Sequence, residues 1–263
     1  MTARSRNIAT RFHPIHGENI MLLEDNTVAY RTASFADSLA FSEKPLQPGE
    51  IFLVEIEKTE RGWSGDMRIG LTLIDPACED NSLPHFAMPN LSELGNTWIF
   101  AITKSHTIWE SFGIGYGEGI KSREKKLITD GVHVQTSRGI IPFNALRANT
   151  IHTSPSILPT DAGSRIGIMY VPQAGSDKAE MHFIINGEDQ GVCGKDIPYK
   201  AGPLRAVVDV YGTTKQVRIV QLYGVSTLQS ACRDAILQYT KKNAVDSLPL
   251  PRLLKNYLLY QSQ

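Results

Sequence analysis

The spacing of apolar side chains changes near residue 225, and this change constrains the fold more than any other feature of the sequence. Before that point, apolar and polar residues alternate over short runs, which is the pattern of β-strands. After it, Leu228, Cys232 and Ile236 recur four residues apart, which places them on one face of an α-helix. Pro251 then suits the first turn of a second helix. The sequence therefore predicts a large β-domain followed by a short helical segment.

Two arrangements could cover the apolar faces of these helices. Helices this short are marginally stable alone, so each must bury its apolar face against something. The helices could pack on the β-domain of their own chain, or they could present their apolar faces to another protein. The spacing alone leaves both arrangements open.

The order of residues in the helical segment resembles a SOCS box. Thr227-Leu228, Cys232 and Ile236 are followed by Leu248-Pro249-Leu250-Pro251 and by Tyr257-Leu258. In that family the first helix binds elongin C, which is paired with elongin B, and the later segment binds a cullin. A Leu-Pro-Leu-Pro sequence is similar to the type that selects cullin-5. The resemblance implies that elongin binds Leu228, Cys232 and Ile236, and that cullin-5 contacts Leu248, Pro249, Leu250, Pro251, Leu254, Tyr257 and Leu258.

The chain from Phe12 to Gly224 has the pattern of one antiparallel β-sandwich. Short apolar runs are separated by Gly, Pro, Asn and Asp, without the helical spacers that parallel strands require. No internal repeat or low-complexity linker divides this stretch, so we expect a single domain. The predicted strands are residues 20–23, 27–31, 51–57, 68–74, 97–102, 165–171, 181–185, 204–210 and 216–222.

Some positions of the β-domain allow finer predictions. Alternation in residues 51–57 predicts that Phe52, Val54 and Ile56 face the core. Asn186-Gly187 is typical of a two-residue hairpin turn. We expect one short helical turn within residues 90–95, and we expect Trp63 to lie in the core.

The β-domain contains a series of short motifs: Phe12-His13-Pro14, residues 16–20, Ala29-Tyr30-Arg31, Ser34-Phe35, residues 41–46 with Glu50, residues 63–72, Asp75-Pro76, residues 185–191 and residues 207–212. Together these motifs resemble a Neuralized homology repeat. The resemblance implies a SPRY-like sandwich of two antiparallel sheets whose end loops bind a protein substrate. The SOCS box would then deliver that substrate to a ubiquitin ligase. It also implies boundaries of 8–224 for the repeat and 225–263 for the SOCS box.

The substrate-binding residues are predicted from the loops, because rigid scaffolds carry recognition on loops. The candidate loops are residues 31–39, 113–119, 137–141 and 211–215. Two alternatives remain open: Tyr211 could belong to the sheet core, and the glycine-rich loop 113–119 could have no binding role. The candidate residues are Arg31, Ser34, Tyr116, Arg138 and Tyr211.

Composition argues against several other classes of function. The chain has 27 Lys and Arg against 27 Asp and Glu, so no charge excess draws it to nucleic acid or an acidic membrane. An odd number of cysteines and an N-terminus without an apolar core predict a cytoplasmic protein with reduced thiols. No run of residues approaches the length of a membrane span.

The sequence also predicts a protein without a catalytic or metal site of its own. Its three cysteines include no CxxC pair, and its seven histidines include no HExxH motif. In the glycine-rich loop, Glu118 takes the place of the last glycine of a dinucleotide-binding motif. We therefore expect no cofactor, and ubiquitin transfer would depend on the RING partner of the cullin. A plain interaction module and a carbohydrate-binding or hydrolytic sandwich are the alternatives.

Overall fold

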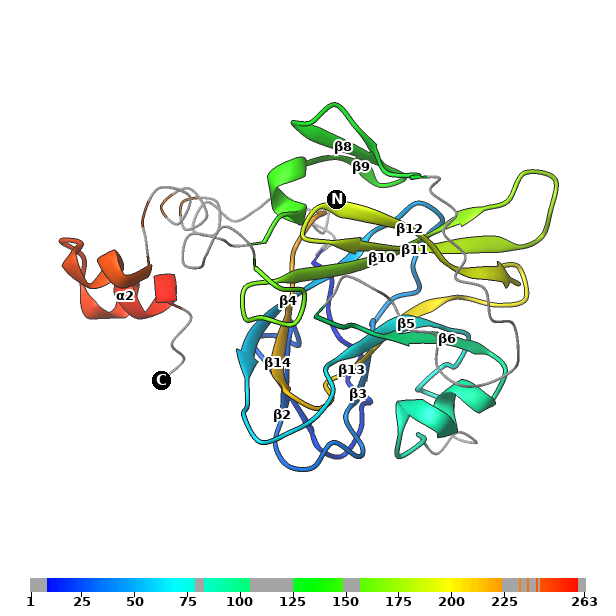
Figure 1. The fold of residues 1–263 in the computed structure, drawn as a ribbon, viewed down its shortest axis with the longest axis horizontal. Coiled ribbons are helices and arrows are strands. Elements are labelled where there is room, and N and C mark those ends of the chain that lie inside the picture. The colour runs from blue at the N-terminus through cyan, green and yellow to red at the C-terminus, as the bar shows by residue number, and fades with distance from the viewer. Residues whose placement is uncertain are drawn as a thin grey trace, which may run out of the picture.

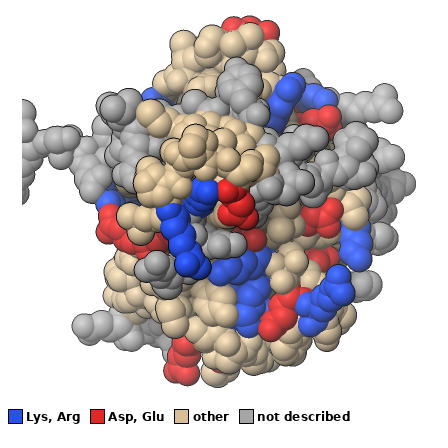
Figure 2. Space-filling view, turned by 90° about the vertical axis from the view of Figure 1, so that its left-hand side faces the viewer, with Lys and Arg blue, Asp and Glu red and all other residues tan. Residues whose placement is uncertain are grey.

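The structure is a computed structural model that describes residues 9–78, 83–104, 125–148, 157–223, 232, 236, 240 and 242–259. Within these residues the chain is mainly antiparallel β-structure, with two sheets packed face to face (Figure 1). The predicted class of fold, an antiparallel β-sandwich followed by a short helical segment, is confirmed. Figure 2 shows Lys and Arg intermingled with Asp and Glu on one side of the molecule, as expected for a chain without net charge.

The larger sheet has seven described strands, and the smaller has four. In spatial order the larger sheet contains β1 (Ile20–Leu23), β2 (Val28–Arg31), β14 (Thr214–Ile219), β4 (Phe52–Thr59), β10 (Arg165–Pro172), β11 (Ala179–Ile185) and β12 (Glu188–Ile197). The smaller sheet contains β3 (Leu39–Phe41), β13 (Arg205–Asp209), β5 (Arg68–Thr72) and β6 (Thr97–Ala101).

A third, three-stranded sheet lies outside the two main layers. It consists of β7 (Ile128–Thr129), β8 (His133–Thr136) and β9 (Gly139–Pro142), and the short helix η2 (Phe143–Leu146) follows it. The sequence did not predict these strands. Residues 137–141, expected to form a binding loop, therefore lie largely within β9 and the turn before it.

The main core lies between the two large sheets. Phe52, Val54 and Ile56 of β4 are buried there, as the alternation predicted. The other face of β4 is also covered, because Val134 and Ile141 of the small sheet form a second cluster with residues such as Leu53. The first residues of β4 are therefore buried on both faces, although apolar and polar residues alternate along its sequence.

The local turn predictions agree with the structure in type and nearly in position. Asn186 and Gly187 adopt φ values of 51° and 90° between β11 and β12, as a tight hairpin turn requires. A short helical element, η1 (Ala87–Leu91), begins slightly before the expected turn.

The described C-terminal residues form a small hydrophobic cluster of their own. Val245 in η4 (Lys242–Ser247) and Leu258 in α2 (Arg252–Leu259) are buried, and Ile236, Leu248, Leu250 and Leu259 pack against them. No residue of the sandwich belongs to this cluster. Figure 1 shows α2 outside the two sheets.

Candidate functional site

Three loops meet at one end of the sandwich, at the bottom of the view in Figure 1. They are residues 32–38 after β2, residues 60–67 after β4 and residues 210–213 after β13. Backbone hydrogen bonds connect them: Val210 N donates to Ser38 O at 3.0 Å, and Thr213 N donates to Gly65 O at 2.9 Å. Residues 83–87 join this end, since Asp37 N donates to His85 O at 2.7 Å. Paired strands thus hold the loops in fixed positions.

Four aromatic side chains gather on these loops around Phe35, and we call them the Phe35 cluster. The ring centroid of Phe35 lies 5.6 Å from Trp63, 5.2 Å from Tyr211 and 6.1 Å from Phe86. Trp63 is 37% exposed, so the prediction that it lies in the core is wrong. Its ring packs on the loops instead, because Trp63 lies between β4 and β5 and outside both strands. The cluster offers a partly exposed aromatic surface.

Arg31 supports this surface from below and is completely buried. Its guanidinium Nη1 donates to Ala33 O at 2.8 Å, and Nη2 donates to Gly212 O at 2.7 Å and to Thr214 O at 3.3 Å. Burial lowers the pKa of the Arg31 guanidinium, against the opposing influence of Glu60 and Asp209. Arg31 was predicted to contact substrate directly, but a side chain this buried instead joins two of the loops.

A second arginine fixes the orientation of Tyr211. Arg68 Nη1 lies 2.7 Å from Asp209 Oδ2, and the Arg68 guanidinium stands 3.5 Å from the centroid of the Tyr211 ring. Ser38 Oγ donates to Asp209 Oδ1 at 2.6 Å. Complete burial raises the pKa of the Asp209 carboxyl, although Arg68 and Ser38 oppose the shift. Tyr211 lies two residues beyond the end of β13 and is half-buried, so it belongs to the loop surface rather than to the sheet core.

Glu60 connects the Phe35 cluster to the outer face of the larger sheet. Its Oε2 accepts hydrogen bonds from Trp63 Nε1 at 3.0 Å and from Lys215 Nζ at 3.1 Å. The hydrogen bond from Lys215 is the main reason that the pKa of Glu60 lies below its ordinary value. The carboxylate therefore stays ionised and holds the indole ring in place.

The five candidate substrate-binding residues do not form one surface. Ser34 is exposed next to Phe35 on the loop after β2, and Tyr211 belongs to the Phe35 cluster, whereas Tyr116 lies outside the described residues. Arg138 is at the opposite end of the sandwich, where its Nη1 lies 2.6 Å from Glu50 Oε1. The sequence analysis gave no role to Phe35, Phe86, Glu60 or Arg68. Residues 31–39 were predicted as a binding loop and Ser34 as a contact residue, but nothing local revealed that distant loops converge on Phe35.

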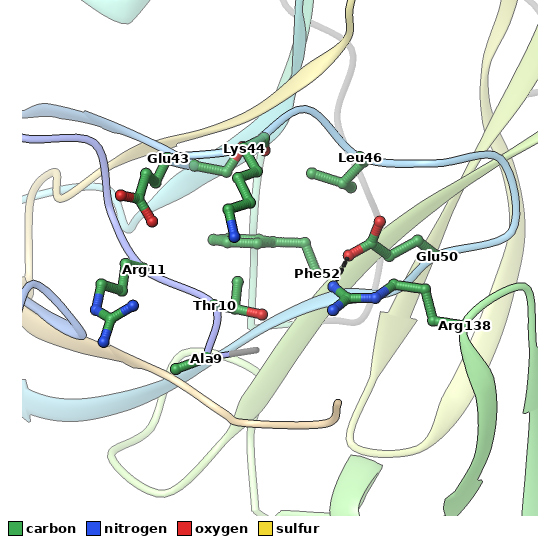
Figure 3. Close-up of a pocket in the computed structure, with 10 residues that line it drawn as sticks. Ala9, Thr10, Arg11, Glu43, Lys44, Leu46, Glu50, Phe52 and Arg138 are labelled. Atoms are coloured by element: carbon green, nitrogen blue, oxygen red, sulfur yellow. Dashed lines mark hydrogen bonds and ion pairs between the residues drawn. The ribbon is translucent and has the colours of Figure 1, made fainter. Parts of the chain in front are cut away.

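Arg138 instead borders a shallow pocket near the N-terminal end of the described chain (Figure 3). Phe52 lines the pocket, and the carboxylate of Glu50 is engaged on both oxygens, by Arg138 and by the backbone N–H of Gln47 at 2.8 Å. The residues that line the pocket are Ala9, Thr10, Arg11, Ser42, Glu43, Lys44, Leu46, Glu50, Phe52 and Arg138.

The C-terminal candidates differ in exposure. Cys232 is exposed, whereas Ile236 packs against the C-terminal cluster. In α2, Leu253 and Leu254 are 71% and 41% exposed, but Leu258 is only 4% exposed. Leu258 was predicted to contact a cullin, but its burial makes it a core residue of the cluster. Pro249 and Pro251 are exposed and Leu248 and Leu250 are half-buried, while Leu228 and the side chain of Tyr257 lie outside the described residues.

Two other kinds of site were sought among the described residues. They contain no group of three His, Cys, Asp or Glu side chains that could hold a metal ion. None of the described helices is both long and apolar enough to cross a membrane.

Gly212 lets two of the loops touch, and its replacement tests that contact. An added Cβ would lie 2.2 Å from Gly65 O, and Gly212 also has a positive φ of 59°. We expect Gly212→Ala to lower the free energy of unfolding by about 2–4 kcal/mol, from backbone strain plus overpacking. Chemical denaturation of the purified variant would measure the loss.

Gly62 provides a matched control for this variant. It also has a positive φ, of 94°, but an added Cβ would meet no atom within 4 Å. Gly62→Ala should therefore carry only the backbone cost, about 1 kcal/mol. Equal losses in the two variants would contradict the steric role given to Gly212.

Comparison with known proteins agrees with this architecture. Residues 12–221 match the family model described as Neuralized, and residues 224–259 match the SOCS box model. The chain is 38% identical to Neuralized-like protein 2 of Homo sapiens over 265 residues, which is 96% of this chain and 92% of that protein. It is 37% identical to human E3 ubiquitin-protein ligase NEURL3 over 98 residues, covering 36% of this chain and 37% of the ligase.

A solved structure shares the fold of the sandwich. The crystal structure of the Drosophila melanogaster neuralized-NHR1 domain matches 81% of this chain and 98% of that domain, with a TM-score of 0.55 and 20% identity. At this identity the match concerns the fold alone. With the two family models in this order along the sequence, the chain belongs to the Neuralized family and carries a SOCS box after its Neuralized domain.

Proposed function

We propose that the chain is the substrate-recognition subunit of a cytoplasmic E3 ubiquitin ligase. Residues 8–224 would capture a target protein, and residues 225–263 would recruit the ligase machinery. The observation that carries the proposal is the C-terminal cluster, which has a core of its own and leaves Leu253 and Leu254 exposed. Exposed leucines on a short helix are typical of a surface that another protein covers.

The recruiting end would bind elongin C, together with elongin B, through Leu228, Cys232 and Ile236. Cullin-5 would bind the segment Leu248 to Pro251 together with Leu254 and Tyr257. The exposure of Cys232, Pro249, Pro251 and Leu254 is compatible with such contacts. Leu258 would support these residues from inside the cluster.

The capturing end would be the Phe35 cluster with its neighbouring loops. Interface energy concentrates in aromatic and arginine side chains that lie in well-packed surroundings. Trp63 meets this description, because Phe35, Arg31 and Glu60 hold its ring while more than a third of the residue stays exposed. Ser34 and Tyr211 border the same surface.

Ubiquitin transfer itself would be left to the RING partner of the cullin. A thiol that accepts ubiquitin must react as a thiolate, which burial disfavours. Burial raises the pKa of the Cys193 thiol, and its Sγ donates to Met181 O at 3.1 Å, so burial disfavours this cysteine. Cys78 and Cys232 are exposed, and neither belongs to a CxxC pair. The name of the NEURL3 relative does not transfer an activity, since the match covers about a third of each chain.

Co-expression with elongin B and elongin C, followed by size-exclusion chromatography, tests the recruiting end. We expect a ternary complex that then binds the N-terminal region of cullin-5 but not that of cullin-2. A monomeric chain that ignores both elongins would contradict the proposal. It would favour the alternative, in which the C-terminal helices pack on their own sandwich and the chain is a simple interaction module.

A charge introduced at Leu228 should abolish this complex. Burial of one leucine contributes about 1.5–3 kcal/mol, and Leu228→Glu would also place a carboxylate in an apolar pocket. The matched control is Leu94→Glu, since Leu94 is a leucine of the sandwich that is already 56% exposed. The control should elute with both elongins, and recovery of Leu228→Glu in the complex at the wild-type yield would contradict the assignment of Leu228.

A further inference from the structure

Two lysine side chains flank Tyr30 on the outer face of the larger sheet, beside the Phe35 cluster. The Nζ atoms of Lys58 and Lys215 lie 5.7 Å and 5.5 Å from the centroid of the Tyr30 ring. The three residues come from β4, β14 and β2, which are neighbours in the sheet. Tyr30 and Lys58 both pair with Gln216 in the strand register. Two cations are thus held against one aromatic ring.

The carboxylates at this end of the sandwich are already engaged by donors of the protein. Glu60 binds Lys215 and Trp63, and Asp66 accepts a hydrogen bond from Thr213. Asp37 Oδ1 lies 2.6 Å from His85 Nδ1, and Asp209 binds Arg68. None of these four groups neutralises Lys58.

On the strip from Tyr30 to Trp63, three cations, Lys58, Arg61 and Lys215, therefore stand against one carboxylate, that of Glu60. Among the residues that the structure describes, neither Lys58 nor Arg61 has a carboxylate partner, and both are exposed. Arg61 belongs to the same loop, residues 60–67, as Glu60 and Trp63. Glu60 links the two regions, since its Oε2 binds both Trp63 Nε1 and Lys215 Nζ. We call Lys58, Arg61 and Lys215 the basic strip.

We propose that the substrate segment carries acidic residues beside an apolar anchor, with the anchor on Trp63 and the acidic side chains on the basic strip. This inference rests on the proposed function, in which the Phe35 cluster binds substrate. The aromatic rings would provide most of the contact area, as they do in other interfaces. The cations would select partners by charge and speed association, because charge complementarity acts mainly on specificity and on-rate.

Selection of peptides on the full-length chain tests this inference. The probe is a displayed library of random twelve-residue peptides, panned at low ionic strength so that exposed charges are weakly screened. We expect selected sequences to be enriched in Asp and Glu within a few positions of an aromatic or aliphatic residue. A selected peptide, labelled and titrated, should bind at least tenfold more weakly to Lys58→Glu/Arg61→Glu, with an affinity that falls as salt rises.

A matched double variant controls for the change in net charge. Lys44 and Lys195 are also exposed but lie elsewhere, Lys44 in the loop after β3 and Lys195 on β12. Lys44→Glu/Lys195→Glu should bind the selected peptide like the wild-type chain. Equal weakening in both double variants would overturn the inference, because the effect would come from net charge alone.

The remaining outcomes separate this inference from the proposed function. Selected peptides that lack an acidic excess but lose binding in Trp63→Ala would overturn the inference and keep the Phe35 cluster as the substrate surface. Peptides indifferent to Trp63→Ala, or a library that yields no binder, would count against that surface and therefore against both.

Discussion

Replacing Arg31 with methionine is expected to lower the free energy of unfolding by about 3–5 kcal/mol, because it removes a buried charge whose two terminal nitrogens donate three hydrogen bonds. The side chain is completely buried, and it donates to the carbonyl oxygens of Ala33, Gly212 and Thr214. Methionine has a similar length but no donor, so the buried carbonyl oxygens of Gly212 and Thr214 would lose this donor. Chemical denaturation of the wild-type chain and of Arg31→Met would measure the loss, provided that the free energy of unfolding depends equally on denaturant concentration in both.

Arg61→Met is the matched control for this variant. Arg61 belongs to the same end of the sandwich but is exposed, and surface substitutions usually change stability by less than about 0.5 kcal/mol. A loss below about 1 kcal/mol for Arg31→Met would contradict the role given to Arg31. Both proteins carry the same change in charge, so their difference reports burial and hydrogen bonding.

Loss of Arg31 should also loosen the surface that it supports. Its guanidinium joins the loop after β2 to the turn between β13 and β14, and it lies 5.2 Å from the centroid of the Trp63 ring. We therefore expect faster amide exchange in residues 32–38 and 210–213, while strands in the main core keep their protection. This pattern would mark Arg31 as a positioning residue for the Phe35 cluster.

The parts of the fold that depend on neighbouring residues could be predicted from the sequence. The Asn186-Gly187 turn needs only two residues that tolerate a positive φ, and they are adjacent in the chain. The core face of β4 follows from alternation within a single strand. The same local reasoning found a helix after Pro251, where α2 begins at Arg252.

The candidate site could not be predicted in this way, because its contacts join distant parts of the chain. Arg31 bonds to residues that are 181 and 183 positions away in the sequence. An arginine at the end of a predicted strand would ordinarily be assigned to the surface, since arginine is rarely buried without partners. The prediction for Trp63 was wrong in the opposite sense: it was expected to be buried because its ring is large and apolar, whereas its loop holds it at the surface.

The burial of the leucines in α2 also could not be predicted from the sequence alone. Leu254 and Leu258 were predicted together as cullin contacts, and residues four apart share a helix face. The structure separates them: Leu258 is 4% exposed and Leu254 is 41% exposed. The difference depends on where η4 packs, because Val245 covers the last turn of the helix and leaves the first turn open. Spacing finds the apolar face of a helix but not how far along the helix a neighbour extends.

This difference allows recruitment and folding to be tested separately. Leu253→Glu/Leu254→Glu changes two exposed side chains, so we expect the chain to fold and still bind the elongins but to lose cullin-5. Burying each leucine against a partner contributes about 1.5–3 kcal/mol, so the pair should weaken cullin-5 binding by at least about a hundredfold. Titration of the purified ternary complex with cullin-5 would measure the affinity.

Leu258→Glu provides the contrast, because Leu258 and Val245 form the centre of the C-terminal cluster. A carboxylate there would destabilise the cluster itself, and the expected result is loss of helicity together with cullin-5 binding. The exposed pair should leave helicity unchanged. Undiminished cullin-5 binding in Leu253→Glu/Leu254→Glu would contradict the proposed contact. Loss of helicity in both variants would instead show that the first turn of α2 is also covered by its own chain. The alternative in which these helices pack on the sandwich would then be favoured.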